Sequence, residues 1–271
     1  MKKSIKRTHI IYFAIITLAM LNCAGSNKTG KLSFVSEDEE ITLGKSLVGE
    51  VSKQFNVIRN QEITDFINNI AREIGVQSDW SALPYQVYIV NSPDLNHFSL
   101  PGGSIFIFRG LIEISETASE VALIIAHEMA HISARDGIDQ LSEKYSYAFA
   151  AQSVMGENPE IPAQIIADLY YEGTILDYGE DKEYLADKRG LKYAWKANYD
   201  PTGLTDILER IGQAESVSPE SVELLYTTHP SASDRLRRAK MEIDQIPQKA
   251  SLRKDLDEFH NIKELLARLP Q

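Results

Sequence analysis

The sequence predicts an α+β domain that is mostly helical and contains a small β-sheet. Two short runs rich in β-branched and aromatic residues, 85–90 and 104–108, are joined through a Pro-Gly-Gly turn. From about residue 116 onward, apolar residues recur at helical spacing instead. Apolar residues make up 43% of the chain and charged residues 25%, which is typical of a folded globular domain.

The N-terminal segment resembles an export signal. Residues 1–22 contain four basic and no acidic residues, and an apolar run from Ile10 to Leu21 follows the basic start. Such a run rises about 18 Å as a helix, which is too short for a hydrocarbon core of about 30 Å. The run ends next to Cys23, the only cysteine, and this resembles a bacterial lipoprotein signal in which the cysteine carries the lipid. An uncleaved N-terminal anchor is the alternative.

The pattern therefore divides the chain into a signal peptide (1–22), a lipidated tether (23–36) and a single domain (37–271). Ser36 followed by four acidic residues predicts the start of a helix that continues towards Phe55. A second amphipathic helix is expected at 61–74. After the two strands, helices are expected near 117–135, 138–155, 160–176, 181–198, 201–213, 231–244 and 252–268.

Composition excludes several classes of function. A single cysteine rules out a disulfide framework and a cysteine-rich zinc or iron–sulfur site. The net charge is −11 and no block of Lys or Arg stands out, so nucleic acid is not expected as a partner.

The chemical centre predicted from the sequence is the motif His127-Glu128-Met129-Ala130-His131, which lies in a strongly apolar helical stretch. The spacing of four residues places both imidazoles on one helix face, one turn apart, so that both can bind a single ion. Glu128 can contact a water molecule on that ion without being a ligand. A pair of hydrogen-bonded core histidines is the structural alternative.

A catalytic zinc ion needs a third protein ligand and one open position. Glu183 and Asp187 share a face of a predicted helix, so Glu183 is a candidate ligand and Asp187 a candidate hydrogen-bond acceptor for a ligand histidine. Spacing alone does not choose between Glu183 and the nearby acidic residues, which are Glu172, Asp177, Glu180 and Asp181.

Four sequence blocks resemble one family of peptidases. They begin at Pro101 (PGGSIFIFRGLI), Ala126 (AHEMAH), Glu183 (EYLADKRGL) and Thr228 (THPSASDRL), in the family's order. The family is that of the zinc metallopeptidases of the CAAX prenyl protease and HtpX type, and the resemblance covers residues 91–240. It implies a gluzincin-type metallopeptidase domain, with the small sheet packed on the active-site helix and one Zn²⁺ per chain.

The resemblance also assigns individual roles. It implies that Glu183 is the third zinc ligand and that Asp187 orients a ligand histidine. It further implies that His229 and Arg235 face the metal, and that Asn96 belongs to the site.

Two departures from the family are visible. Asn-His-Phe-Ser at 96–99 replaces the usual Asn-Ala-Phe-Ala, and Arg135-Asp136 replaces a common Arg-His. We interpret His97 as a surface residue, with an additional site residue as the alternative.

These assignments give a mechanism for peptide hydrolysis. Zinc held by His127, His131 and Glu183 activates a water molecule, and Glu128 is the general base that later protonates the leaving amine. His229 and Arg235 are expected to stabilise the oxyanion. Alternatively, His229 occupies the open position as a fourth ligand and holds the enzyme inactive.

The segment 104–108 is expected to be an edge strand to which an extended substrate adds by backbone pairing. The expected substrate-binding residues are Asn96, Gly102, Gly103, Ile105 and Ile107. The stretch 137–176 fits a lid over the cleft and an ordinary packed helical pair equally well.

The expected function is a periplasmic, lipid-anchored zinc endopeptidase that hydrolyses misfolded or misassembled envelope proteins. The N-terminal lipid would attach it to a membrane. Ala24 stands where some bacteria use Asp for inner-membrane retention, which favours the outer membrane. The alternative is a non-proteolytic, chaperone-like lipoprotein with the same metal site, either structural or latched.

Overall fold

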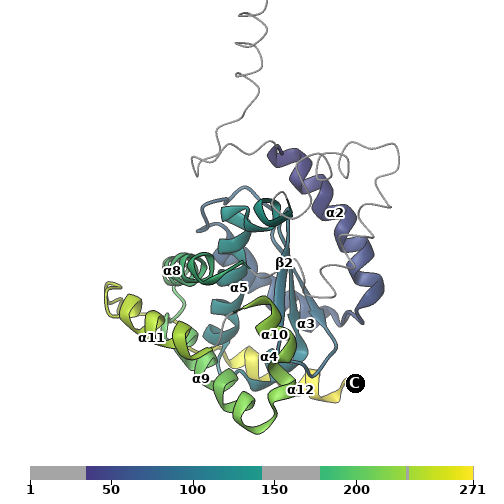
Figure 1. Cartoon of the computed structure of the whole chain (residues 1–271). Helices are drawn as coiled ribbons and strands as arrows, with labels where there is room; N and C mark the ends of the chain where they lie inside the picture. The colour runs from purple at the N-terminus through teal and green to yellow at the C-terminus, as the bar shows by residue number, and fades with distance from the viewer. Residues whose placement is uncertain (1–34, 142–177, 230–231, 271) are drawn as a thin grey trace, which may run out of the picture.

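The computed structural model describes residues 35–141, 178–229 and 232–270. The predicted signal peptide, the lipidation site Cys23 and most of the stretch 137–176 lie outside the described residues. Within them the predicted fold class is confirmed, since helices surround one small β-sheet (Figure 1). None of the described helices is long and apolar enough to cross a bilayer.

Helix α2 (Glu37–Gln54) begins where the sequence predicts. The Ser36 hydroxyl accepts a hydrogen bond from the Glu39 N–H, and the Glu39 carboxylate accepts one from the Ser36 N–H, which together form a capping box. Glu40 anchors the buried face of α2, because its carboxylate lies 2.5 Å from Nε of the Arg135 guanidinium. The N-terminal helix is therefore joined to the region that follows the His-Glu motif.

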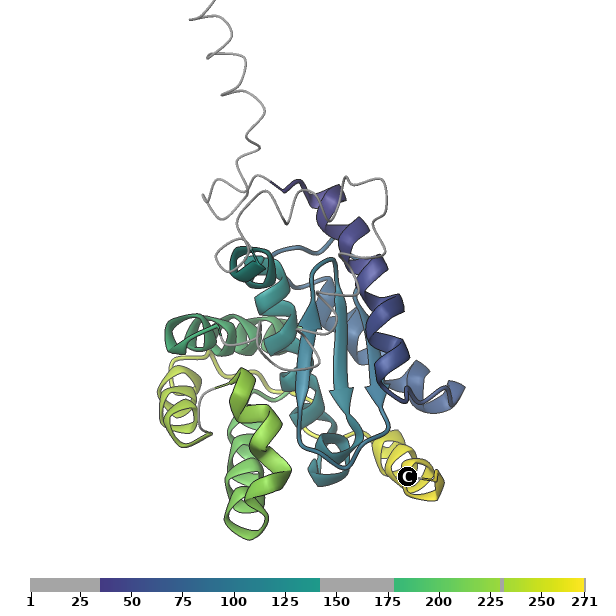
Figure 2. The ribbon, with the colours of Figure 1, turned by 45° about the vertical axis from the view of Figure 1, so that its right-hand side comes forward.

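The sheet has three strands, β1 (Gln86–Val90), β2 (His97–Leu100) and β3 (Ser104–Phe108). Their order is β1-β3-β2, with β3 parallel to β1 and antiparallel to β2. In Figure 2 the sheet lies between α2 and the helices that carry the candidate site. The expectation that 104–108 is an edge strand is therefore wrong, because β3 is paired on both sides.

The turn between β2 and β3 explains the two adjacent glycines. Gly102 and Gly103 have φ values of 80° and 107°, a region that L-residues with a side chain rarely adopt. Helix α2 covers this turn: a β-carbon on Gly102 would lie 2.9 Å from the Ile41 Cα. The turn glycines thus bring α2 and the sheet into close contact.

The expected helices 138–155 and 160–176 lie mostly or wholly outside the described residues; the other helices agree with the expected segments to within a few residues, except at the C-terminus. There the helix starts at residue 257 rather than 252, because Arg253 instead forms a parallel bridge with Tyr199. The sequence did not predict β2, α4, α10 or the 3₁₀ turn. The elements are α3 (Gln61–Gly75), α4 (Arg109–Ile114), α5 (Ala118–Ala134), α8 (Glu180–Lys196), α9 (Thr202–Val217), η1 (Pro219–Val222), α10 (Glu223–Thr228), α11 (Ala232–Ile243) and α12 (Asp257–Arg268).

Helix α5 is the centre of the molecule. Every residue from 118 to 133 is buried, as expected for a helix that is apolar on all sides. A capping box between Thr117 and Glu120 starts the helix, and Arg210 of α9 pairs with Glu120 at 2.8 Å. Helices α8 and α9, β2 and α3 all pack against α5. The core therefore holds the metal motif rigidly.

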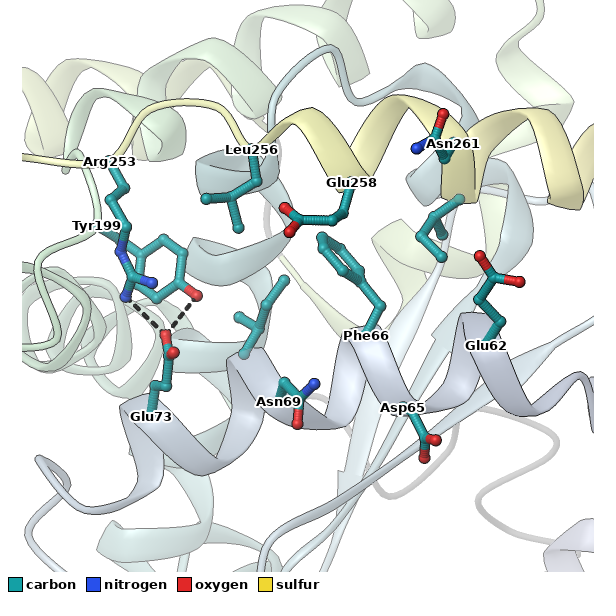
Figure 3. A pocket seen from close by; sticks show the side chains of 12 residues that line it. Glu62, Asp65, Phe66, Asn69, Glu73, Tyr199, Arg253, Leu256, Glu258 and Asn261 are labelled. Carbon is teal, nitrogen blue, oxygen red and sulfur yellow. Dashed lines mark hydrogen bonds and ion pairs between the residues drawn. The ribbon is translucent and has the colours of Figure 1, made fainter.

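The C-terminal segment is attached to α3 away from the metal motif. The Glu73 carboxylate accepts hydrogen bonds from the Arg253 guanidinium (2.6 Å) and the Tyr199 hydroxyl (2.8 Å), and Phe66 stacks on Phe259 of α12. A groove of about 500 Å³ between the two helices has an apolar floor and an acidic rim (Figure 3). This groove contains no histidine, so it is separate from the predicted chemistry.

Candidate metal centre

His127 and His131 lie one turn apart on the buried face of α5 and present their Nε2 atoms to the same point. The two Nε2 atoms are 3.1 Å apart. Zinc binds imidazole nitrogen at about 2.0–2.1 Å, so two donors of one tetrahedral ion lie roughly 3–4 Å apart. The spacing thus suits a shared ion.

Each of these imidazoles is oriented by a carboxylate on its other nitrogen. His127 Nδ1 donates to Asp187 Oδ1 (2.9 Å), and His131 Nδ1 donates to Asp136 Oδ2 (3.0 Å). This pairing fixes the tautomer in which Nε2 is free to bind a metal. Sequence reasoning placed Asp187 but missed Asp136, although the departure from Arg-His at that position was visible.

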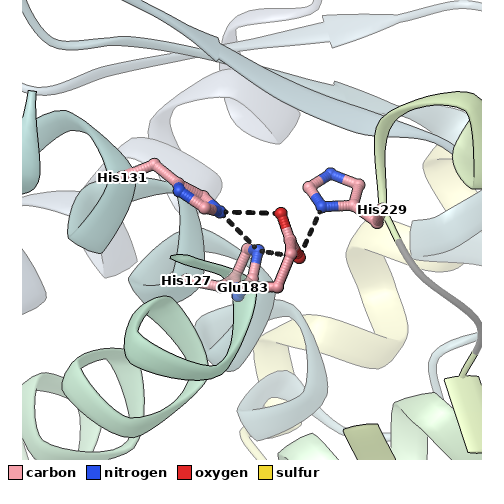
Figure 4. A group of neighbouring side chains, drawn as sticks. All are labelled: His127, His131, Glu183 and His229. Atoms are coloured by element: carbon pink, nitrogen blue, oxygen red, sulfur yellow. Dashed lines mark hydrogen bonds and ion pairs between the residues drawn. The ribbon is translucent and has the colours of Figure 1, made fainter. Parts of the chain in front are cut away.

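Glu183 on α8 completes the group and lies between the two imidazoles of α5 and His229 (Figure 4). Its Oε1 lies 3.2 Å from His131 Nε2 and its Oε2 lies 3.5 Å from His127 Nε2. Oε1 is buried and makes no well-directed hydrogen bond. A buried carboxylate oxygen and two bare ring nitrogens around one point are the donor set of a zinc ion, so these residues fit the cofactor.

His229, just after α10, lies beside Glu183. Its Nδ1 is 2.9 Å from Glu183 Oε2, and the four residues His127, His131, Glu183 and His229 each offer one ligand atom within 4.8 Å of the others. The geometry is thus compatible with His229 as a fourth ligand as well as with a role beside the open position.

The pKa shifts in this group also favour a bound cation. Burial alone would raise the pKa of the Glu183 carboxyl, but the charges of His229 and His131 lower it well below its usual range. Burial would lower the pKa of His131, yet Glu183 and Asp136 raise it to about 10. Without metal the cluster binds a proton where the ion would bind, so zinc binding releases that proton.

Arg235 of α11 contacts Asp187, the carboxylate that orients His127. Its Nε donates to Asp187 Oδ2 (3.0 Å) and its Nη2 to Asp187 Oδ1 (2.8 Å), a bidentate pair that is almost fully buried. The pair holds Asp187 as an anion, which in turn orients His127. These contacts support a positioning role, and the oxyanion role stays a prediction, since Arg235 Nη1 also lies 3.9 Å from Glu183 Oε2.

His97 lies in the site, so its interpretation as a surface residue is wrong. Only 3% of it is exposed, its Nδ1 lies 2.5 Å from Glu128 Oε1, and its ring stacks on His229 at a centroid distance of 4.4 Å. Burial and the neighbouring His229 lower the pKa of His97 to about 3, so the ring is neutral and donates to Glu128. Burial would raise the pKa of Glu128, but this hydrogen bond lowers it below its usual range.

The residues predicted to bind substrate are placed differently. Ile105 and Ile107 are fully buried in the central strand, so they cannot pair with a substrate. Gly102 and Gly103 pack against α2 and Leu83. Asn96 is buried next to the site, where its side-chain oxygen accepts a hydrogen bond from the His97 N–H.

Two imidazoles and a carboxylate that converge on one point, with a further glutamate beside them, define the class of this centre: a zinc metallopeptidase. The chain belongs to peptidase family M48, whose model matches residues 58–243. Zinc is the cofactor of this family.

Named relatives agree with this assignment. The chain is 26% identical over 200 residues to the mitochondrial metalloendopeptidase OMA1 of Schizosaccharomyces pombe, an alignment that covers 73% of this chain and 57% of the relative. It is 23% identical over 223 residues to the beta-barrel assembly-enhancing protease of Yersinia pestis (78% and 45%). It is 22% identical over 226 residues to that of Escherichia coli strain K12 (79% and 46%). The chain spans about half the length of these relatives.

Proposed function

We propose that the protein is a zinc endopeptidase that cleaves unfolded or misassembled proteins of the bacterial envelope. The observation that carries the proposal is that metal ligands and a separate general base lie around one point. His127, His131 and Glu183 provide three donors from α5 and α8, His229 stands beside them, and Glu128 stays outside this set on the same helix turn. Three ligands and a separate base are typical of a catalytic site, whereas a structural zinc ion has four protein ligands.

In the proposed reaction, His127, His131 and Glu183 would hold the zinc ion, which would supply the positive charge that polarises the scissile carbonyl and makes water more acidic. Glu128 accepts a proton from the attacking water and passes it to the leaving amine. Asp187 and Asp136 keep the ligand imidazoles oriented, and Arg235 keeps Asp187 charged. His229 is the side chain best placed to donate a hydrogen bond to the oxyanion.

We propose that substrate pairs with β2, which replaces β3 in the earlier expectation. The hydrogen bond from the Phe108 N–H to the Asn96 carbonyl fixes the ladder, so the peptide groups of His97 and Ser99 turn away from β3. The His97 carbonyl lies 3.4 Å from His229 Nε2. A chain added at this edge would therefore run past the metal centre, and backbone pairing favours unfolded substrates with little side-chain specificity.

The envelope location rests on the N-terminal sequence. We propose that Cys23 is lipidated after removal of residues 1–22, and that the lipid holds the domain at the periplasmic face of the outer membrane. Labelling with a radioactive fatty acid tests this: wild-type protein is expected to incorporate label and Cys23→Ser is not. Equal labelling of both, or of neither, would contradict the proposal.

The decisive experiment for proteolysis is Glu128→Gln, with zinc content and cleavage of an unfolded protein measured on the same sample. We expect zinc to stay and cleavage to fall at least about a hundredfold, because the general base is lost. The matched control is Glu62→Gln on the exposed surface of α3, which should keep both zinc and activity. Retained cleavage in Glu128→Gln would refute the mechanism.

A latched, non-proteolytic binding protein is the second candidate, and the placement of His229 favours it. As a fourth ligand, His229 would close the zinc sphere. If His229 latches the ion, His229→Ala should raise cleavage; if it stabilises the oxyanion, His229→Ala should lower it. Wild-type protein that holds zinc but never cleaves, together with a His229→Ala variant that also never cleaves, would establish the binding function instead.

A further inference from the structure

The two ring nitrogens of His229 face two different groups of side chains. Nδ1 points to Glu183 of the zinc centre (2.9 Å). Nε2 lies 3.8 Å from Glu128 Oε1, which is also 2.5 Å from His97 Nδ1. His97, Glu128 and His229 are each at most 3% exposed and can each offer a ligand atom within 4.8 Å of the others. A second potential ligand group thus adjoins the first.

We propose that His97, Glu128 and Nε2 of His229 form a second, weaker Zn²⁺ site that inhibits the peptidase when it is filled. This inference rests on the proposed function, since inhibition requires Glu128 to be the general base. A Glu128 carboxylate that binds a cation cannot accept a proton from water. The same ion also fixes His229 between the two sites.

The donor chemistry identifies the ion. Two imidazole nitrogens and one carboxylate oxygen suit zinc, whereas magnesium and calcium prefer oxygen ligands alone. Donors of one zinc ion lie roughly 3–4 Å apart, so the present separations need shifts of about 1 Å. To bind the ion through Nδ1, His97 changes tautomer: the Nδ1 hydrogen that it now donates to Glu128 leaves to solvent, Nε2 takes up a proton from solvent, and the ring stays neutral.

Competition makes this site weaker than the first. A zinc ion in the second site must replace the His97–Glu128 hydrogen bond. It is also repelled by the positive charge of the zinc ion in the first site. His97 is the member that the zinc centre does not use, and it stands where the family pattern has alanine. The site is therefore a property of this chain's own sequence.

The test is a zinc titration of the metal-free full-length protein by calorimetry or equilibrium dialysis, which does not depend on activity. We expect wild type to bind two equivalents, the second at least about tenfold more weakly than the first. His97→Ala should bind one equivalent. His97→Gln should also bind one, because it keeps an N–H donor for Glu128 but lacks the ligand nitrogen, and its melting temperature reports on folding. His260→Ala, which removes an exposed histidine on α12, should still bind two.

Activity is measured on the same samples at one and at several equivalents of zinc. At several equivalents of zinc, the activity of wild type should be at least about tenfold lower than at one equivalent. For each His97 variant, the ratio of these two activities should stay near one. A second equivalent that persists in both His97 variants, or a wild type that binds only one, would overturn the proposed site. If the stoichiometry behaves as expected but no sample ever cleaves, the site stands and the peptidase function is refuted.

Discussion

Gly190 of α8 lies against the backbone of His127 of α5, so close that a β-carbon on the glycine would come within 2.9 Å of the His127 amide nitrogen. The glycine lets the two helices approach, and this approach brings Glu183 and Asp187 of α8 to the imidazoles of α5. The metal centre thus requires a glycine at position 190, because a larger residue there would separate the two helices that carry its ligands.

The first prediction follows from this contact. Gly190→Ala should lower the free energy of unfolding by about 1–3 kcal/mol, because the added methyl group meets backbone that cannot move aside, and it should weaken zinc binding as the helices separate. Denaturant unfolding and competition with a chelator measure the two effects. The matched control is Gly212→Ala in α9, where a β-carbon has no neighbour within 4 Å, and which should be neutral or slightly stabilising. Equal behaviour of the two variants would show that the contact does not matter.

The second prediction separates the two roles considered for Arg235. Arg235→Ala leaves the buried Asp187 carboxylate without its cation, so we expect zinc affinity to fall about 10–100-fold and stability to drop. Arg235→Lys should recover part of this loss, since lysine restores the charge but not the bidentate geometry. Arg237→Ala, an exposed neighbour on α11, is the control. Unchanged zinc affinity with a collapsed kcat would instead support the oxyanion role.

The third prediction concerns the edge of β2. Ser99→Pro removes one N–H that points away from β3, without breaking a bond to that strand, so it should lower kcat/KM for a long unfolded substrate while leaving zinc content unchanged. We expect a loss of about 2–13-fold, which corresponds to the roughly 0.5–1.5 kcal/mol of one hydrogen bond to substrate. Ser99→Ala keeps the N–H and should behave like wild type. A Ser99→Pro enzyme with full kcat/KM would exclude pairing at this position.

The fourth prediction concerns pH. Burial raises the pKa of Glu40 from its ordinary 4.5 to about 7, despite the opposing charge of Arg135. Between these two pH values the folded protein binds more protons than the unfolded chain, so the free energy of unfolding falls as pH rises from about 4.5 to about 7. The loss attributable to Glu40 reaches about 3 kcal/mol and is complete above pH 7.

Urea unfolding of wild type and Glu40→Gln at pH 5 and pH 8 measures this effect. The variant lacks the titrating group, so the difference between the two proteins should change with pH, even though loss of the Arg135 pair lowers the variant's stability at both. Parallel curves would contradict the assignment.

The sequence predicted most helices because their apolar spacing and caps are local features. Ser36 and Glu39 start α2 through their own hydrogen bonds, and the apolar stretch around His127 could only be a buried helix. Strand β2 was missed because His97–Leu100 has little intrinsic strand character and becomes a strand only by pairing with β3. That omission also caused the error about the edge strand, since two known strands appeared to leave β3 unpaired.

The site residues divide in the same way. His127 and His131 follow from spacing on one helix, but Asp136 and His97 depend on how distant segments pack. His97 is 31 residues from its partner Glu128 in sequence, and only the close packing of β2 on α5 brings them together. Arg235 was found through a motif, but its bidentate pair with Asp187 became visible only in the fold.

The zinc ligands belong to helices that are far apart in the chain, and this gives the ion a mechanical role. His127 and His131 belong to α5 and Glu183 to α8, so a bound ion closes a loop of about 50 residues, as a disulfide of similar span would, and removes loop entropy from any state that retains the metal. The metal is thus a removable cross-link. Chelation should both stop catalysis and release α8 from α5, which couples the lifetime of the folded enzyme to the supply of zinc around it.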